Sequence, residues 1–221
     1  MPETLTFATK PELARRMLKY ALENGVPARW LTADSLYGGD GRLRQDCLEH
    51  QLSYVLGVRS TQNVLAWHNG VAYAVSIGEV VQNLKADAWE QLSAGEGAKG
   101  PRVYEWAGGQ IRPSAAQPGW MEWGLARRSL SDPTDLAYYL ACAPVPTTQQ
   151  QLVAVATTRW AVEESLETAK GEVGLDQYEV RRWTGWYRHI TLAWLAQAFL
   201  TVTRAQAVGS DGQNGGSWNE M

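Results

Sequence analysis

Three groups of residues in this 221-residue chain have types and spacings that could carry chemistry. The first is Asp34, which follows a strand-like run over 28–33 and precedes a glycine-containing turn over 35–41. A carboxylate at the end of a strand, beside such a turn, can face a cleft and bind a metal ion. The same aspartate can instead cap the turn that follows it, and the sequence leaves both interpretations open.

The second group lies on one predicted helix. Glu163 follows Arg159 by four residues and Lys170 follows Glu163 by seven, so the three side chains share one helix face. Such a face can place a metal-binding carboxylate between cations that hold phosphates. A solvated face with one ordinary ion pair, contributing about 0.3–0.5 kcal/mol, explains the same spacing. Glu164, the nearest other acid, points about 100° away around the helix.

In the third group, basic residues alternate with aromatic ones. Its members are Arg181, Arg182, Trp183, Trp186, Tyr187, Arg188 and His189. Arginines contact phosphates and aromatic rings stack on bases, so one interpretation is a DNA-binding cluster. The other is that the aromatic residues are core residues of the following helix and the arginines flank its start. His189 has no neighbours with metal-ligand spacing, which favours a structural hydrogen bond.

Composition and missing motifs exclude several classes of protein. There is no Walker phosphate loop, no Gly-x-Ser-x-Gly elbow and no Cys/His zinc spacing; the segment 93–100 lacks the Gly-Lys-Ser/Thr ending of a nucleotide site. Two cysteines are too few for a disulfide framework, which favours a cytoplasmic protein. No apolar run reaches the roughly 18 residues of a membrane span, so no membrane partner is expected. The net charge of −3 confines any nucleic-acid surface to a local patch.

The periodicity of the first 60 residues predicts an α/β fold. A helix over 10–24 has Thr9 as its cap, Pro11 in its first turn and Gly25 after its end. The predicted elements that follow are a strand over 28–33, a loop over 35–41, a helix over 42–50 and a buried strand over 52–58.

Beyond residue 60 the pattern changes twice. Glycine, proline and short strand-like runs dominate to about residue 146, and the segment 92–100 is predicted to be a loop. Helical periodicity returns over 148–171 and 184–207. We therefore expect a partial core over 1–60, a strand-rich antiparallel insertion over 61–147, C-terminal helices over 148–208 that complete the core, and a disordered tail over 209–221.

Taken together, these motifs resemble the transposases of bacterial insertion sequences in the DDE superfamily, in the branch with a strand-rich insertion. The segment Asp34-Ser35-Leu36-Tyr37-Gly38 is similar to that branch's Asp-x-x-Tyr-Gly motif. Arg159, Glu163 and Lys170 match the spacing of its Tyr-x2-Arg-x3-Glu-x6-Lys signature, with Ala156 at the tyrosine position. The resemblance extends over about residues 7–207 and also includes the segments 89–100, 170–181 and 186–189.

The resemblance implies a ribonuclease H-like fold whose carboxylates hold Mg²⁺ or Mn²⁺ and which cleaves and joins DNA at transposon ends. Asp34 would be the second acid and Glu163 the third. Arg159 and Lys170 would contact phosphates near them. The arginines assigned to DNA binding are Arg181, Arg182 and Arg188.

The family's first acid lies on a strand upstream of the helix that here begins near residue 10, and only Glu3 is acidic in that stretch. We therefore expect a truncated form that holds metal weakly, is catalytically impaired and leaves the strand 30–33 with an unpaired edge. The alternative is a non-catalytic remnant that binds DNA or a full-length transposase. A second copy of the chain, forming a homodimer, is a further candidate partner. A ribonuclease H-like nuclease with another role and an inert remnant are further readings.

Overall fold

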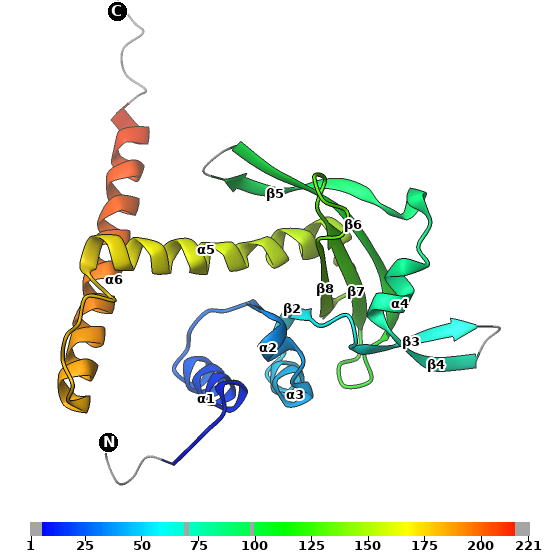
Figure 1. The fold of residues 1–221 in the computed structure, drawn as a ribbon, viewed down its shortest axis with the longest axis horizontal. Coiled ribbons are helices and arrows are strands. Elements are labelled where there is room, and N and C mark those ends of the chain that lie inside the picture. Colours follow the sequence, from blue (N-terminus) through cyan, green and yellow to red (C-terminus); the bar gives the residue numbers. More distant parts are fainter. Residues whose placement is uncertain (1–5, 69–70, 98–99, 215–221) are drawn as a thin grey trace, which may run out of the picture. The chain divides into compact units, whose positions relative to one another are not determined.

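The structure is a computed structural model that describes residues 6–68, 71–97 and 100–214. It divides into a larger unit, Thr6–Arg159, and a smaller unit that begins at Trp160. The order of the elements can be followed in Figure 1. Among the described residues, none of the helices combines the length and apolar character needed to cross a membrane.

Strands dominate the described part of the larger unit. Six form one sheet in the order β1-β2-β8-β7-β6-β5, and β3 and β4 form a separate hairpin. β1 runs parallel to β2, and the other neighbours are antiparallel. The strands are β1 (Trp30–Ala33), β2 (Ser53–Val58), β3 (Asn63–His68), β4 (Val71–Ser76), β5 (Glu90–Gly97), β6 (Gly100–Pro113), β7 (Trp120–Arg128) and β8 (Leu136–Pro144).

Helices cover both faces of this sheet. In chain order they are α1 (Lys10–Glu23), α2 (Ser35–Gly38), α3 (Gly41–Glu49), α4 (Ile77–Gln82), the 3-10 helix η1 (Ala86–Ala88) and α5 (Gln149–Val173), which begins in this unit. The mixed sheet with its helices confirms the predicted α/β class and is consistent with a partial ribonuclease H-like fold.

The buried strand β2 explains how apolar residues cover the two faces of the sheet beside it. All six of its residues are buried, as predicted for this apolar run. Val55 packs with Leu152 and Val153 of α5 on one face. Leu56 points to the other face, where it packs with Cys47 of α3 and residues of α1. Successive side chains of a strand alternate between faces, so β2 needs apolar residues at every position.

β1 is an edge strand of the sheet. Among the described residues it pairs with β2 alone, with Ala33 opposite Leu56. The expectation of an unpaired edge at this strand is therefore confirmed for the described residues. Because β1 and β2 are parallel, their carboxyl ends lie at the same margin of the sheet.

Local signals set the bounds of the predicted helices. The side chain of Thr9 accepts a hydrogen bond from the Glu12 amide, Pro11 lies in the first turn, and Gly25 follows the end of α1 with a φ of 74°. At the start of α5, Thr148 and Gln151 exchange hydrogen bonds between side chain and backbone. Both helices confirm the sequence predictions.

The smaller unit contains the end of α5 and the long helix α6 (Trp183–Asn214). Its core consists of Ala169, Leu175 and Ala193, with Leu166, Val173 and Ile190 packed around them. Arg204 of α6 forms an ion pair with Glu172 of α5 at 2.6 Å. These contacts hold the two helices together.

Three sequence predictions need correction. The predicted loop over 35–41 contains the helical turn α2, because Asp34 caps it. The predicted loop over 92–100 is largely β5, since hydrogen bonding to β6 outweighs the low strand propensity of its glycines, with a shift of register between Ser93 and Glu96. Residues 98–99 lie outside those described. Helix α6 continues past residue 207 to Asn214, because each further residue adds a backbone hydrogen bond; the rest of the predicted tail, 215–221, lies outside those described.

Candidate active site

Asp34 occupies the junction between β1 and α2. Its Oδ1 accepts a hydrogen bond from the backbone amide of Leu36 at 2.9 Å, so the aspartate does cap the turn that follows it. The residue is nevertheless exposed, and among the described residues its second oxygen, Oδ2, accepts no hydrogen bond. Capping and ligand binding are therefore compatible, because each uses a different oxygen of the carboxylate.

Two glycines determine where Asp34 lies. A Cβ atom on Gly38 would overlap the carbonyl oxygen of Gly57 and lie 2.9 Å from Cβ of Leu56. A Cβ atom on Gly57 would lie 3.2 Å from the amide nitrogen of Ser35. The turn α2 thus packs with its backbone directly on β2, a close approach that only glycine permits. This contact fixes Asp34 at the margin where the parallel strands end.

Arg44 secures the same turn from α3. Its guanidinium donates a hydrogen bond to the carbonyl oxygen of Gly38, the last residue of α2. Asp40 caps α3 by accepting a hydrogen bond from the amide of Arg42 at 2.8 Å. The turn that carries Asp34 is therefore held by β2 on one side and by α3 on the other.

Asp34 lines a hollow of about 660 Å³ within the larger unit. The hollow lies at the carboxyl ends of β1 and β2 and is also lined by the first residues of β8 and by Arg159 of α5. Its polar lining residues are Asp34, Ser35, Arg59, Ser60, Thr61, Tyr138, Tyr139 and Arg159. A second hollow of about 390 Å³ shares Ser35, Arg59 and Thr61 with it. The structure therefore brings Asp34 and Arg159, two of the predicted site residues, to one cavity.

Two arginines and a phenol line the same hollow as the Asp34 carboxylate. Arg59 is exposed and forms no ion pair among the described residues. Burial raises the pKa of Tyr139, while the charges of Arg127 and Arg159 act in the opposite direction. The Tyr139 hydroxyl consequently stays protonated at neutral pH and can donate a hydrogen bond. A phosphate group would meet positive charge and hydrogen-bond donors here.

The remaining predicted site residues belong to the smaller unit. Glu163 and Lys170 lie on α5, where Glu163 comes one turn after Arg159, and both are exposed. The three arginines assigned to DNA binding are also exposed; they are Arg181, Arg182 and Arg188. That Asp34 and Glu163 share one cation stays a prediction.

A metal at Asp34 is compatible with the chemistry of this carboxylate. Its second oxygen is a hard ligand of the kind that Mg²⁺ and Mn²⁺ accept. Within the described parts of the chain, no group of three or more His, Cys, Asp or Glu side chains is placed to hold a metal ion.

Sequence reasoning missed Arg59 and Tyr139. Arg59 directly follows β2, just as Asp34 directly follows β1, so the parallel pairing of these strands brings the two residues to one margin. Each of these residues follows an apolar run in the sequence, and this shared pattern could have indicated that Arg59 lies near Asp34. Tyr139 reaches the hollow because β8 pairs with β2, and no local pattern indicates that pairing.

One family model matches the first part of this chain. A search of curated proteins found no match to this chain. Residues 1–106, which carry Asp34, both packing glycines and Arg59, match the family model of the DDE superfamily endonucleases, and this match supports a nuclease or transposase of that superfamily.

Proposed function

We propose that this chain is a transposase of the insertion-sequence branch of the DDE superfamily, acting on DNA phosphodiesters at transposon ends. The observation that carries the proposal is the position of Asp34, whose second oxygen is available in a hollow lined by Arg59 and Arg159. The match of residues 1–106 to DDE superfamily endonucleases supports it.

In this proposal each residue has a defined task. Asp34 and Glu163 hold Mg²⁺ or Mn²⁺, which when bound supplies charge stabilisation at the phosphate oxygens and lowers the pKa of bound water. Arg59 and Arg159 attract the phosphodiester and orient it in the hollow. Tyr139 donates a hydrogen bond to a phosphate oxygen, which would replace the phenol absent at Ala156.

The proposal predicts weak metal binding. Two carboxylates, Asp34 and Glu163, give a divalent cation fewer charged ligands than an octahedral site can accept. A third carboxylate from a partner polypeptide, such as a full-length transposase or a second copy, would tighten the site. Cleavage by this chain alone is therefore expected to be slow.

Asp34 can be tested against a matched aspartate. Asp132 also caps a turn through an i,i+2 hydrogen bond, to the Thr134 amide at 3.0 Å, and is absent from the hollow. Binding of Mn²⁺ alone would be measured by electron paramagnetic resonance, and nicking of supercoiled DNA by gel assay. We expect Asp34→Asn and Glu163→Gln to weaken Mn²⁺ binding at least tenfold and to remove nicking. Asp132→Asn is expected to retain both.

The results separate the proposal from its alternative. Equal Mn²⁺ binding and nicking by wild type, Asp34→Asn and Asp132→Asn would overturn the proposed site. The second candidate function is DNA binding without cleavage, alone or with a full-length transposase, which the exposed arginines near the start of α6 favour. Salt-dependent DNA binding, with no Mn²⁺ bound at Asp34 and no nicking, would support that candidate instead.

A further inference from the structure

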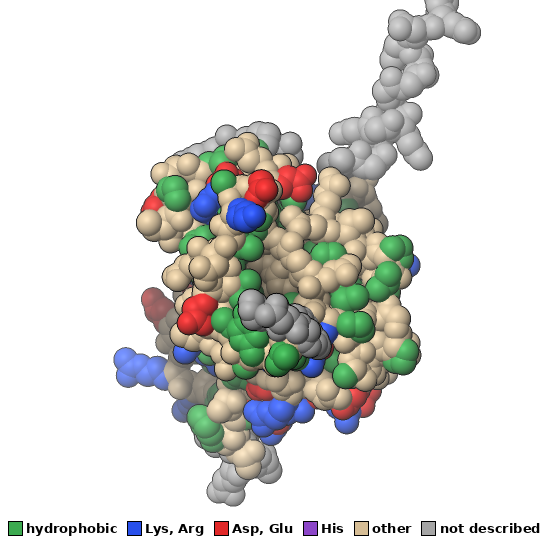
Figure 2. All heavy atoms as spheres, turned by 90° about the vertical axis from the view of Figure 1, so that its right-hand side faces the viewer, with side chains coloured by type: hydrophobic (Ala, Val, Ile, Leu, Met, Phe, Trp, Pro, Cys, Tyr) green, Lys and Arg blue, Asp and Glu red, His purple; other side chains and the backbone are tan. Residues whose placement is uncertain are grey.

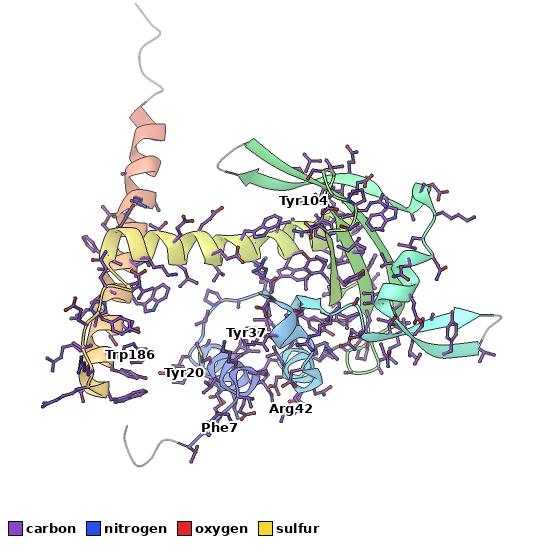
Figure 3. The ribbon with its side chains drawn as sticks, viewed as in Figure 1. Phe7, Tyr20, Tyr37, Arg42, Tyr104 and Trp186 are labelled. Carbon is purple, nitrogen blue, oxygen red and sulfur yellow. The ribbon has the colours of Figure 1, made fainter. Side chains whose placement is uncertain are left out.

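The start of α6 carries three aromatic rings that contact one another. The ring centroids of Trp183 and Tyr187 lie 5.3 Å apart, and those of Trp183 and Trp186 lie 5.5 Å apart. Trp186, labelled in Figure 3, is half-buried. Trp183 and Tyr187 are 38% and 56% exposed, so they are not core residues. We call these rings, with Arg181, Arg182 and Arg188, the aromatic–arginine cluster.

The segment before α6 is fixed against the helix, which gives the aromatic–arginine cluster a defined shape. A ring nitrogen of His189 lies 3.0 Å from the carbonyl oxygen of Gly174, which confirms the predicted structural hydrogen bond of this histidine. A Cβ atom on Gly185 would lie 3.3 Å from Cβ of Val180. The hydrogen bond between His189 and Gly174 and the packing of Val180 against Gly185 hold the segment before α6 close to the helix. Arg181 and Arg182 therefore lie beside the first turn of α6.

The arginines of this cluster differ from most others in the chain. Among the described residues, at least seven arginines form ion pairs with carboxylates: Arg15, Arg16, Arg42, Arg112, Arg127, Arg128 and Arg204. Figure 2 shows basic and acidic side chains close together in several places on one face. Among the described residues, Arg181, Arg182 and Arg188 form no ion pair, and neither does Glu179, the nearest acid in the sequence.

The helix itself increases the positive charge at this position. The first turn of α6 contains no acidic residue, whereas the positive end of a helix normally favours acids and disfavours cations. Three arginines near this end therefore repel the helix dipole and one another. A bound anion would offset this electrostatic repulsion. The exposed rings beside the arginines would stack on a planar group of the same ligand.

We propose that the aromatic–arginine cluster binds single-stranded DNA. One unpaired base stacks on the ring of Tyr187, the more exposed of the two, beside Trp183, and the flanking phosphates contact Arg181, Arg182 and Arg188. Stacking needs a base that is released from its pair, so the site prefers a single strand to a duplex of the same length. This inference rests on the proposed function only in taking DNA as the partner; it requires neither metal nor Asp34.

The test uses the full chain and a fluorescein-labelled 15-nucleotide oligo(dT), measured by fluorescence anisotropy in EDTA, with a duplex of equal length beside it. We expect Tyr187→Ala to weaken binding of the single strand about 5- to 140-fold, the effect of losing one stacked base. Tyr187→Phe keeps the ring and is expected to restore most of the affinity. Phe199→Ala removes another exposed aromatic residue of α6, 69% exposed, and is expected to change binding less than twofold.

The contribution of the arginine charges is measured separately, by the salt dependence of binding. Arg188→Ala is expected to lower the slope of log K against log salt concentration by about 0.7, the share of one phosphate contact on a single strand. Tighter binding of the duplex, or equal effects of Tyr187→Ala and Phe199→Ala, would overturn the inference. Normal oligo(dT) binding without Asp34-dependent nicking would overturn only the proposed function. Nicking that depends on Asp34, with oligo(dT) binding unaffected by Tyr187→Ala, would overturn only the inference.

Discussion

Two adjacent glycines are predicted to respond to the same substitution in opposite directions. In Gly38→Ala the new methyl group would overlap the carbonyl oxygen of Gly57 and lie 2.9 Å from Cβ of Leu56. These atoms belong to the buried strand β2 and cannot move aside. In Gly39→Ala the nearest atom is the carbonyl oxygen of Ser35 at 3.5 Å, an ordinary contact, and Gly39 already has helical dihedral angles of −69° and −20°.

The magnitudes follow from these distances. Overpacking against a rigid neighbour costs about 3 kcal/mol, the upper end of the usual range. The lower entropy of the unfolded chain offsets about 0.4–1 kcal/mol of this, which leaves Gly38→Ala about 2 kcal/mol less stable than wild type. For a chain of this length, that loss lowers the melting temperature by about 4–8 °C. Gly39→Ala has only the entropic term and is expected to gain about 0.4–1 kcal/mol.

Urea unfolding followed by far-ultraviolet circular dichroism measures both variants against wild type. The difference between the two alanine variants, about 3 kcal/mol, is well above the error of such a comparison. If Gly38→Ala unfolded at the wild-type midpoint, or if Gly39→Ala lost as much stability, the packing of α2 on β2 would not be as described. A Gly38→Ala variant that unfolds early should also nick DNA more slowly, because Asp34 would be displaced.

Four further predictions concern other residues of the larger unit. Burial raises the pKa of Cys47 to about 12 and of Cys142 to about 11, so both thiols should react slowly with iodoacetamide at pH 8 in the native protein and rapidly in urea. Because the unfolded thiols ionise near pH 9, the free energy of unfolding should fall as the pH rises from 9 to 11, which urea titrations at several pH values would detect. Arg128 lies 4.1 Å above the ring of Trp89, and Arg128→Lys should cost about 1 kcal/mol in a urea titration; no change would argue against this contact. Arg59→Ala should reduce the salt slope of duplex DNA binding by about 0.9 with stability unchanged, and an unaltered slope would exclude a phosphate contact.

Elements that depend on local patterns were predictable from the sequence. Helix α1 has a cap, a proline and a terminal glycine at the expected positions, and β2 is apolar along its whole length. Asp34 was found because a carboxylate follows a short strand and precedes a glycine turn. In each case the signal lies within a few residues of the feature, so no knowledge of the tertiary structure is needed.

Features that depend on strand order were not predictable. Tyr139 lines the same hollow as Asp34 because β8 pairs with β2, although about eighty residues separate these strands in the sequence. The segment of β5 is rich in glycine and becomes a strand because β6 is available to pair with it. That Asp34 and Glu163 share one cation also stays a prediction, because the two carboxylates are remote in the sequence and no local pattern relates them.

Among the described residues β1 pairs with a neighbour on one side only, so the strand that ends at Asp34 is unevenly protected from solvent. Its inward peptide groups are shielded by β2, whereas the outward ones should take up deuterium nearly as fast as an unfolded chain. A ligand that binds Asp34 in the folded state adds its binding free energy to the local stability of this margin. Occupancy of the carboxylate would then be visible as slower deuterium uptake along β1 while the interior of β2 stays unaltered, which offers a way to detect the ligand without observing any reaction.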